Sequence, residues 1–454
     1  TRMSVEFIIG ILLLVSFAGL VAYAVKGGNL MTGILIMAII WTVLPLIGNA
    51  LVTNPDFIAQ NSDIVNMSIV DALKKVFQGG PEGWGGVLIN FIFGAWFGRI
   101  MLETGIAATI IRKTVELGGD KPIVTSTLLA VVTTAVFSSM FGAGAVVAIG
   151  VIVLPILLSL GIPKLLATVS FLLSIGAGLY INPVIFNQYQ AFYLGANGEQ
   201  TYFYNGGYLK WGFVALAVQL IVAILIPAIL MKKQKRVHAW AAQAPQTEEV
   251  KAAPVIALLT PFIPVVLAIG FNVPVIVGFL VASFFALAVC GKLTSYKAAS
   301  EVFNKTFYDG AIDTAPLVGF MLMIPMFNKA AELCVPYFNA VLGGLIPNNT
   351  LVICVAFAIL APLGMFRGPF TLAGCGAATL GILKSVGFGT PLLFPLMYAP
   401  TVTMNISSCI TQSWIVWGLG YTKVDTKDFL KLSIPAGWLI CAILSLITYI
   451  MFGM

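Results

Sequence analysis

The sequence predicts an all-α polytopic membrane protein, an inverted repeat with two re-entrant hairpins and two broken helices. Three observations predict this fold class. Of the 454 residues, 59% are hydrophobic and 9% are charged, whereas a soluble domain has about 25% charged residues. The apolar segments are interrupted in four places, which form two matched pairs along the chain. The loop charges give the members of each pair opposite orientations across the bilayer.

Five stretches contain no charged residue: residues 27–55, 122–163, 165–198, 252–291 and 385–422. Because a spanning helix needs about 20 apolar residues, several of these stretches cross the bilayer once or twice. The basic residues behind the net charge of +7 cluster at helix ends. This distribution is typical of cytoplasmic flanks, so we expect a lipid bilayer as a partner and no nucleic acid.

The six cysteines follow no zinc, redox or disulfide spacing, and the only histidine is His238. We therefore expect no metal site and no cofactor, and we interpret the cysteines as small buried hydrophobic residues. The first apolar segment, residues 7–25, lacks a cleavage site of the A-x-A type, which indicates a retained span.

The first half, residues 1–231, is expected to form repeat 1. It contains two helices, a polar segment that suits the outer face, a third helix that returns inward, a hairpin, a broken helix and a last span. In order, these are residues 5–25, 30–47, 49–83, 90–105, 123–160, 165–190 and 211–231. The hairpin breaks at SSMFGAGA, residues 138–145. The broken helix is interrupted where Asn182 precedes Pro183, because proline removes a helix hydrogen bond.

Residues 232–253 contain five lysines and arginines together with His238, and we expect a cytoplasmic linker with this histidine in solvent. The second half, residues 254–454, repeats the pattern. Two helices, an outward helix, a connection, a hairpin, a broken helix and a last span are expected at residues 255–270, 273–289, 308–327, 337–349, 351–388, 391–418 and 432–451.

The loop charges decide the orientation of the halves. Helix three runs from outside to inside, whereas its counterpart starts at the inner flank near Lys305 and runs outward. The loop after the first broken helix is poor in bases, but the loop after the second contains Lys423, Lys427 and Lys431. Corresponding elements therefore have opposite orientations, the duplication on which many secondary transporters are built.

Arg367 is the only charge between residues 333 and 383, in the sequence GMFRGPFTLAGCGAATLG. An arginine at the bilayer centre costs about 2.5–3.5 kcal/mol on insertion scales, so it needs a partner or a wet pocket. Pairing with a carboxylate is its natural role. Half-helix N-termini favour an anion, and unwound carbonyls with Asn and Ser side chains can coordinate a cation. The alternatives are an arginine that reaches the lipid headgroups and glycine-rich tips that serve only close helix packing.

Lys305, Asp309 and Asp313 are spaced four residues apart, so they share one face of a helix. Asp313 lies two turns deeper than Lys305, and a membrane carboxylate is a candidate carrier of a coupling proton. The alternative is a hydrated helix entrance. Arg99 and Glu103, which have the same spacing, and Glu332 are further, weaker candidates for this role, but for the first two we favour an ion pair within helix three. The candidate ion-coupling set is Asp313, Asp309, Asn182 and Asn405.

Three stretches carry a resemblance to a known family: NFIFGAWFGRIMLETGIAATIIRKTVELGGDKP, FRGPFTLAGCGAATLGILKSVG and NISSCITQSWIVWGLGYTKVDTKDFLK. They resemble proteins of the gluconate permease family, which belongs to the ion transporter superfamily. The resemblance implies an inverted repeat, a scaffold domain for dimerisation, a transport domain with elevator movement, and proton-coupled uptake of sugar acids or related carboxylates. The first hairpin, SSMFGAGAVV, departs from that pattern, which leaves another organic anion open as the substrate.

Carried over to this sequence, the resemblance places the hairpin tips and the helix breaks at the substrate. Together with the polar residues that follow each break, the candidate substrate-binding set is Arg367, Gly368, Thr371, Ser138, Ser139, Gly142, Gly144, Asn182, Asn187, Asn405, Ser407 and Ser408.

We therefore expect a secondary active symporter for a small organic anion, coupled to H⁺ or Na⁺, in a bacterial-type cytoplasmic membrane and forming a homodimer. The closest alternative is a cation/proton antiporter on the same scaffold, in which replacement of Arg367 leaves exchange intact. An intramembrane enzyme is disfavoured because no HExxH motif or cofactor fingerprint is present. A passive channel is disfavoured because matched breaks favour alternating access.

Overall fold

The computed structural model describes residues 4–195, 198–231 and 252–454. These residues form helices joined by turns and loops, without a strand. Within these ranges, seven helices are long and apolar enough to cross a membrane, or eight if one bent pair counts as a span. The prediction of an all-helical polytopic membrane protein is confirmed. Most of the predicted linker, including His238, lies outside the described residues.

The first half begins with two long helices, followed by short pieces that lead into a third long helix. Its elements are α1 (Val5–Val25), α2 (Leu30–Leu51), α3 (Pro55–Gln60), α4 (Ser62–Val65), α5 (Ile69–Leu73), η1 (Lys74–Gln78), α6 (Gly79–Gly83), α7 (Gly85–Glu103), α8 (Ile106–Gly118), α9 (Pro122–Phe137), α10 (Ala143–Ser159), α11 (Lys164–Leu179), α12 (Pro183–Gln190), η2 (Ala191–Tyr193) and α13 (Gly206–Leu230). The polar segment at 49–83 is thus mostly helical, and the side chains of Asn54 and Ser68 cap two of its helices.

The second half is organised around one very long helix. Its elements are η4 (Val255–Phe262), α14 (Ile263–Phe271), α15 (Val275–Val289), α16 (Tyr296–Leu342), α17 (Thr350–Leu360), η5 (Ala361–Arg367), α18 (Gly376–Val386), α19 (Thr390–Ala399), η6 (Pro400–Ile406), α20 (Ser413–Thr422), α21 (Thr426–Thr448) and η7 (Tyr449–Gly453).

The connection predicted at 337–349 is wrong in its first part, because α16 continues to Leu342. This helix has 47 residues and includes Pro316, Pro325 and Pro336. Prolines need not end a membrane helix when neighbouring groups satisfy the freed carbonyls. At 1.5 Å per residue α16 is about 70 Å long, more than twice the roughly 30 Å hydrocarbon core.

The helical segment that ends in α7 lies antiparallel to α16. Three ion pairs join the two: Lys75–Glu332 at 3.2 Å, Arg99–Asp313 at 2.5 Å and Glu103–Lys305 at 2.8 Å. Residue numbers rise along one helix as they fall along the other, so these counterparts run in opposite directions, as predicted for an inverted repeat. The interpretation of Arg99 and Glu103 as a pair within helix three is wrong, because each bonds across to α16.

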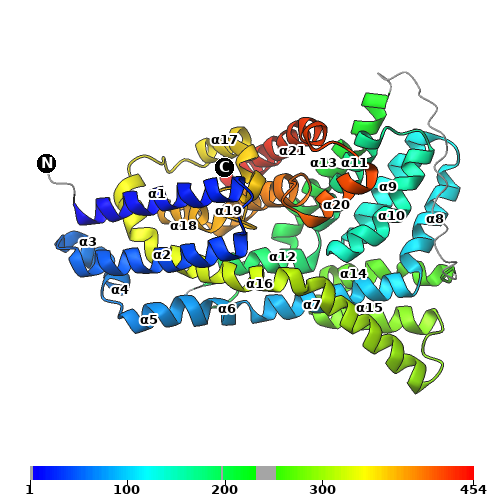
Figure 1. Cartoon of the computed structure of the whole chain (residues 1–454), viewed down its shortest axis with the longest axis horizontal. Helices are drawn as coiled ribbons and strands as arrows, with labels where there is room; N and C mark the ends of the chain where they lie inside the picture. The colour runs from blue at the N-terminus through cyan, green and yellow to red at the C-terminus, as the bar shows by residue number, and fades with distance from the viewer. Residues whose placement is uncertain (1–3, 196–197, 232–251) are drawn as a thin grey trace.

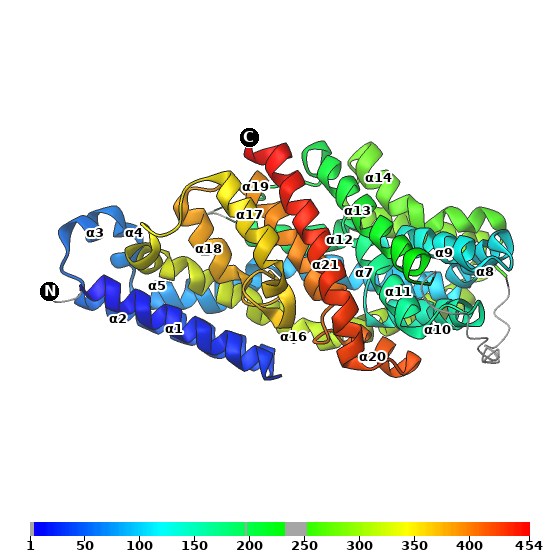
Figure 2. The same ribbon diagram turned by 90° about the horizontal axis from the view of Figure 1, so that it is seen from above.

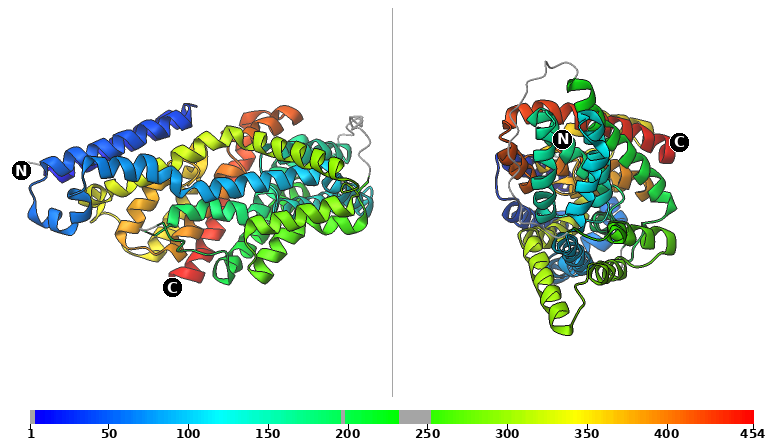
Figure 3. Two further views of the ribbon diagram at one scale, coloured as in Figure 1. Left: turned by 90° about the horizontal axis from the view of Figure 1, so that it is seen from below. Right: turned by 90° about the vertical axis from the view of Figure 1, so that its right-hand side faces the viewer.

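Helices from the start of each half pack on the long helix of the other half. α1 and α2 lie along α16, whereas α15 packs on α7. Figure 1 shows α1 and α2 at one end of the long axis and α14 and α15 at the other. In Figure 3 the long helices run between these ends. Such a reciprocal exchange is the arrangement that a pseudo-two-fold axis produces.

The rest of each half forms the remaining body of the molecule, where α9 and α11 pack on α13, and α17 and α19 pack on α21. Figure 2 shows α21 crossing the middle of the molecule. All four predicted interruptions lie in this body. Turns separate α9 from α10 and α11 from α12. The chain bends by 70° between α11 and α12. Non-helical residues separate η5 from α18, and a π-helix followed by turns leads to α20.

Candidate functional site

The tip of the second hairpin has a strained backbone. Phe366 and Arg367 have φ angles of 52° and 59°, a left-handed conformation that costs roughly 1–2 kcal/mol for a residue with a side chain. Neighbouring groups hold it in place. The Phe366 amide donates to Cys409 Sγ at 3.0 Å, and the Arg367 carbonyl accepts from the Cys375 amide at 3.0 Å.

The Arg367 guanidinium is a half-buried cation without an acidic partner among the described residues. Nη1 donates to the Ala373 carbonyl at 2.9 Å, and Nη2 donates to Gln412 Oε1 at 3.3 Å. The Phe320 ring of α16 lies 5.0 Å from the guanidinium carbon. Nε is buried and has no hydrogen-bond partner in the part of the chain that the structure describes. A guanidinium has five N–H donors, so this one retains capacity for an anion.

The second helix break, which Arg367 contacts through Gln412, contains further unpartnered groups. Asn405 and Ser408 are fully buried. Gln412 Nε2 donates to Asn405 Oδ1 at 2.5 Å. Asn405 Nδ2 and Ser408 Oγ have no hydrogen-bond partner among the described residues. Three of the seven buried unpartnered side-chain atoms in the described structure thus belong to Arg367 and this break. Each such atom costs about 1–3 kcal/mol, which a ligand would offset.

The first hairpin has no such deficit. Ser138 and Ser139 donate to the carbonyls of Ala135 and Val136 at 2.6 and 3.3 Å. Asn182 Nδ2 donates to the carbonyls of Phe137 and Met140 at 3.0 and 3.2 Å, and Asn182 Oδ1 caps α12. The Asn182 amide is therefore fully used in joining the hairpin to the broken helix.

The tip of the first hairpin faces an ion pair of the long helices. Gly142 has a φ of 117°, which L side chains rarely adopt. A Cβ on Gly144 would lie 2.7 Å from Asp313 Oδ2, so the carboxylate packs on the N-terminus of α10. Arg99 and Asp313 line a cavity of about 10 Å³ at this tip. Asp309 lies half-buried one turn before Asp313.

The remaining predicted residues have structural contacts. Gly368 is buried where a Cβ would collide with the Leu363 carbonyl. Thr371 Oγ1 accepts from the Ala373 amide at 3.2 Å. Ser407 Oγ donates to the Val402 carbonyl at 2.7 Å. Asn187 lies half-buried on α12.

A polar network between the two broken helices escaped the sequence prediction. Gln219 of α13 is fully buried and donates through Nε2 to the Leu173 carbonyl at 2.9 Å and to Ser407 Oγ at 3.1 Å. It accepts from Thr403 Oγ1 at 2.6 Å, and Thr403 also bonds to the Tyr180 hydroxyl at 2.6 Å. The sequence feature that could have revealed this network is a single glutamine within the apolar span of α13.

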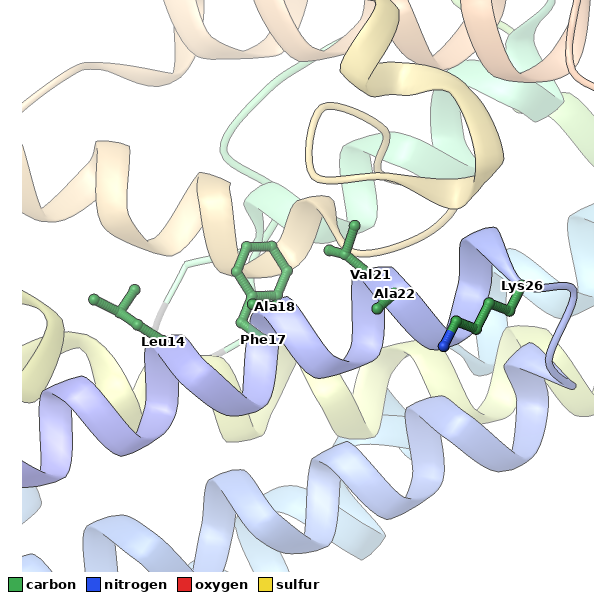
Figure 4. A pocket seen from close by; sticks show the side chains of 6 residues that line it. All are labelled: Leu14, Phe17, Ala18, Val21, Ala22 and Lys26. Carbon is green, nitrogen blue, oxygen red and sulfur yellow. The ribbon is translucent and has the colours of Figure 1, made fainter.

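Another cavity is mainly apolar. It has a volume of about 510 Å³ beside α1 and is lined by Leu14, Phe17, Val21 and other residues of that helix. Figure 4 shows these side chains, with Lys26 as the single charge. Its apolar lining suits hydrocarbon rather than a small anion.

No protein-family model and no curated protein matches the chain. Among solved structures, the chain is similar to the YdaH transporter of Alcanivorax borkumensis, whose crystal structure is reported to reveal an unusual topology. The TM-score is 0.58 and the identity 14%, over 93% of this chain and 99% of that chain. The fold is therefore that of a membrane transporter.

Proposed function

We propose that the protein is a secondary active transporter that carries a small organic anion, a carboxylate or sugar acid, together with H⁺ or Na⁺. The observation that carries this proposal is Arg367, a cation at a helix break whose Nε has no partner and which no described acid neutralises. A guanidinium presents paired N–H groups that match the two oxygens of a carboxylate. Asn405 Nδ2 and Ser408 Oγ supply further donors.

The movement we propose follows the division of the fold. The hairpins and broken helices would move as a transport domain against a scaffold that includes α7 and α16, and the scaffold would form a homodimer. The transporter fold and the resemblance to the gluconate permease family support this assignment. Both hairpin tips meet α16, one at Asp313 and the other at Phe320, so sliding would change both contacts together.

The competing function is a cation/proton antiporter, which would use Asp313 as its carboxylate. Arg99 already binds both Asp313 oxygens, at 2.5 and 2.6 Å. A carboxylate paired in this way is a weaker candidate for binding a free cation. The geometry favours the anion symporter.

Uptake into proteoliposomes tests the proposal. Uptake of a panel of carboxylates that includes gluconate and succinate is measured under an imposed pH or Na⁺ gradient. The proteins compared are the wild type, Arg367→Ala and Arg367→Lys. The matched control is Arg112→Ala, which removes an exposed arginine of α8. We expect gradient-driven uptake by the wild type and the control, and its loss in Arg367→Ala.

Two results would overturn the proposal. One is uptake by Arg367→Ala at the wild-type rate. The other is gradient-driven cation exchange without carboxylate uptake, which persists in Arg367→Ala and identifies an antiporter.

A further inference from the structure

A second polar cavity lies between α16 and α18. Its volume is about 250 Å³, and its lining includes Asn328, Glu332, Gly381, Lys384 and Ser385. Unlike the apolar cavity beside α1, it presents charged and amide groups, so it can hold a hydrated or polar molecule.

The charges around this cavity do not cancel. Lys329 and Lys75 bind the two carboxylate oxygens of Glu332 at 2.8 and 3.2 Å. Lys384 makes no ion pair among the described residues. Its Nζ donates to the Phe192 carbonyl at 3.0 Å and lies 4.9 Å from the Tyr193 ring centroid. Three ammonium groups and one carboxylate leave a net charge of +2.

The cavity and Arg367 lie along the same face of α16. Phe320, which stacks on Arg367, and Asn328, which lines the cavity, are eight residues apart on α16 and therefore share a face. At 1.5 Å per residue they are about 12 Å apart. Lys384 likewise lies eight residues after Gly376, where α18 begins beside the hairpin tip. Both helices thus place the cavity roughly 12 Å from the cation at the tip.

We propose that this cavity is a second anion-binding site, which captures a small carboxylate through Lys384 before it passes to Arg367. The proposal rests on the proposed function. An ammonium has three donors, and Lys384 spends one on Phe192, so donors remain for a carboxylate. A point charge of this kind binds less rigidly than a bidentate guanidinium, which suits a site that must release its ligand.

The charge pattern of the loops places this site on the outer side. Lys75 lies in the segment predicted to face outward, and Glu332 lies beyond the point where α16 is predicted to emerge. Their ion pair brings these two segments together. A cationic cavity there raises the local concentration of anions and their rate of capture.

The test uses Lys384→Gln, which removes the charge at similar length, and Lys384→Arg, which retains it. The control is Lys431→Gln, because Lys431 is exposed and forms only a surface pair with Asp428 at 3.3 Å. Gluconate and succinate are the probes, in calorimetric titrations of detergent-solubilised protein and in uptake by proteoliposomes at several ionic strengths.

We expect two binding events in the wild type, of which Lys384→Gln loses the weaker and Arg367→Gln the stronger. In uptake, Lys384→Gln should raise KM about tenfold, leave kcat within twofold and weaken the dependence of kcat/KM on salt. Lys384→Arg and Lys431→Gln should stay within twofold of the wild type.

A Lys384→Gln variant with wild-type KM and salt dependence, alongside an inactive Arg367→Ala, would overturn this inference and leave the proposed function intact. No binding or uptake of either probe by the wild type would overturn both. If native mass spectrometry shows that Lys384→Gln loses only bound phosphatidylglycerol, with unchanged carboxylate binding, the cavity is a lipid headgroup site and the inference is wrong.

Discussion

Arg99 binds both carboxylate oxygens of Asp313, through Nε at 2.5 Å and Nη2 at 2.6 Å. This pair joins α7 to α16 directly beneath Gly144 at the tip of the first hairpin. The second hairpin instead offers α16 the uncompensated cation of Arg367. The two tips are therefore electrostatically different: the first meets an ion pair, and the second presents a cation without an acidic partner among the described residues.

Replacing Asp313 with Asn should destabilise the protein, because it leaves the Arg99 guanidinium partly buried without its partner. We expect a loss of roughly 1–3 kcal/mol, between the values for exposed and buried pairs. Apparent melting temperatures in detergent measure it. Glu103→Gln is the control, since Lys305 is 58% exposed and the loss should stay below about 1 kcal/mol. If Asp313 also carries the coupling proton, Asp313→Asn protein should no longer concentrate solute under a pH gradient. Equal melting temperatures for Asp313→Asn and Glu103→Gln would contradict the prediction that the Arg99–Asp313 pair stabilises the protein more than the Glu103–Lys305 pair.

Adding a methyl group at Gly144 should disturb the contact between the first hairpin and α16. Its Cβ would lie 2.7 Å from Asp313 Oδ2, and Arg99 prevents the carboxylate from moving away. Gly144→Ala should therefore lower the melting temperature and slow uptake. Gly86→Ala on α7 is the matched control, because no described atom outside its own stretch of helix lies within 4 Å of the position that its methyl group would occupy, and alanine favours a helix. Identical behaviour of the two variants would show that the hairpin tip does not rest on Asp313.

The sequence was sufficient for the interruptions, because glycine, proline and polar residues are easily recognised within apolar helices. Asn182 before Pro183 marked the bend between α11 and α12, and the Arg367 region marked the second hairpin. The sequence did not allow us to predict which residues pair with each other across the fold. The spacing of Arg99 and Glu103 favoured a local pair, but the antiparallel helix α16 presents Asp313 to the first and Lys305 to the second.

The two asparagines at the helix breaks should respond differently to replacement by alanine. Asn182→Ala removes two donors to carbonyls and the cap of α12, so we expect a loss of at least about 2 kcal/mol. Asn405→Ala removes one hydrogen bond and one unpartnered amide group. It should be less destabilising but should weaken carboxylate binding. Thermal unfolding and titration with gluconate separate these effects. An Asn405→Ala variant that unfolds at a lower temperature than Asn182→Ala would contradict this distinction.

The contrast between the asparagines was also hidden from the sequence, since both occupy similar positions after a polar or aromatic segment. Which amide is satisfied depends on the carbonyls that the neighbouring hairpin presents. In the same way the sequence did not single out Lys384, and only its place beside Glu332 in the cavity between α16 and α18 distinguishes it.

Gln219→Leu should destabilise the protein because the Leu173 carbonyl and the hydroxyls of Ser407 and Thr403 lose a buried partner. Each lost bond costs about 1 kcal/mol or more. The control is Ser283→Ala, which removes a buried hydroxyl without a hydrogen-bond partner in the described structure and should be nearly neutral. Thermal unfolding in detergent measures both, and a Gln219→Leu variant as stable as the control would show that the network contributes nothing.

The most direct measurement is the affinity of the purified protein for gluconate and succinate before and after Arg367→Gln. If Arg367 holds the solute carboxylate, the charge-assisted bonds should contribute about 2 kcal/mol or more, so Kd should rise by about 30-fold or more. Arg367→Lys should give an intermediate value, because an ammonium retains the charge but not the paired donors. Equal affinities for the wild type and Arg367→Gln would contradict an anion site at the second hairpin.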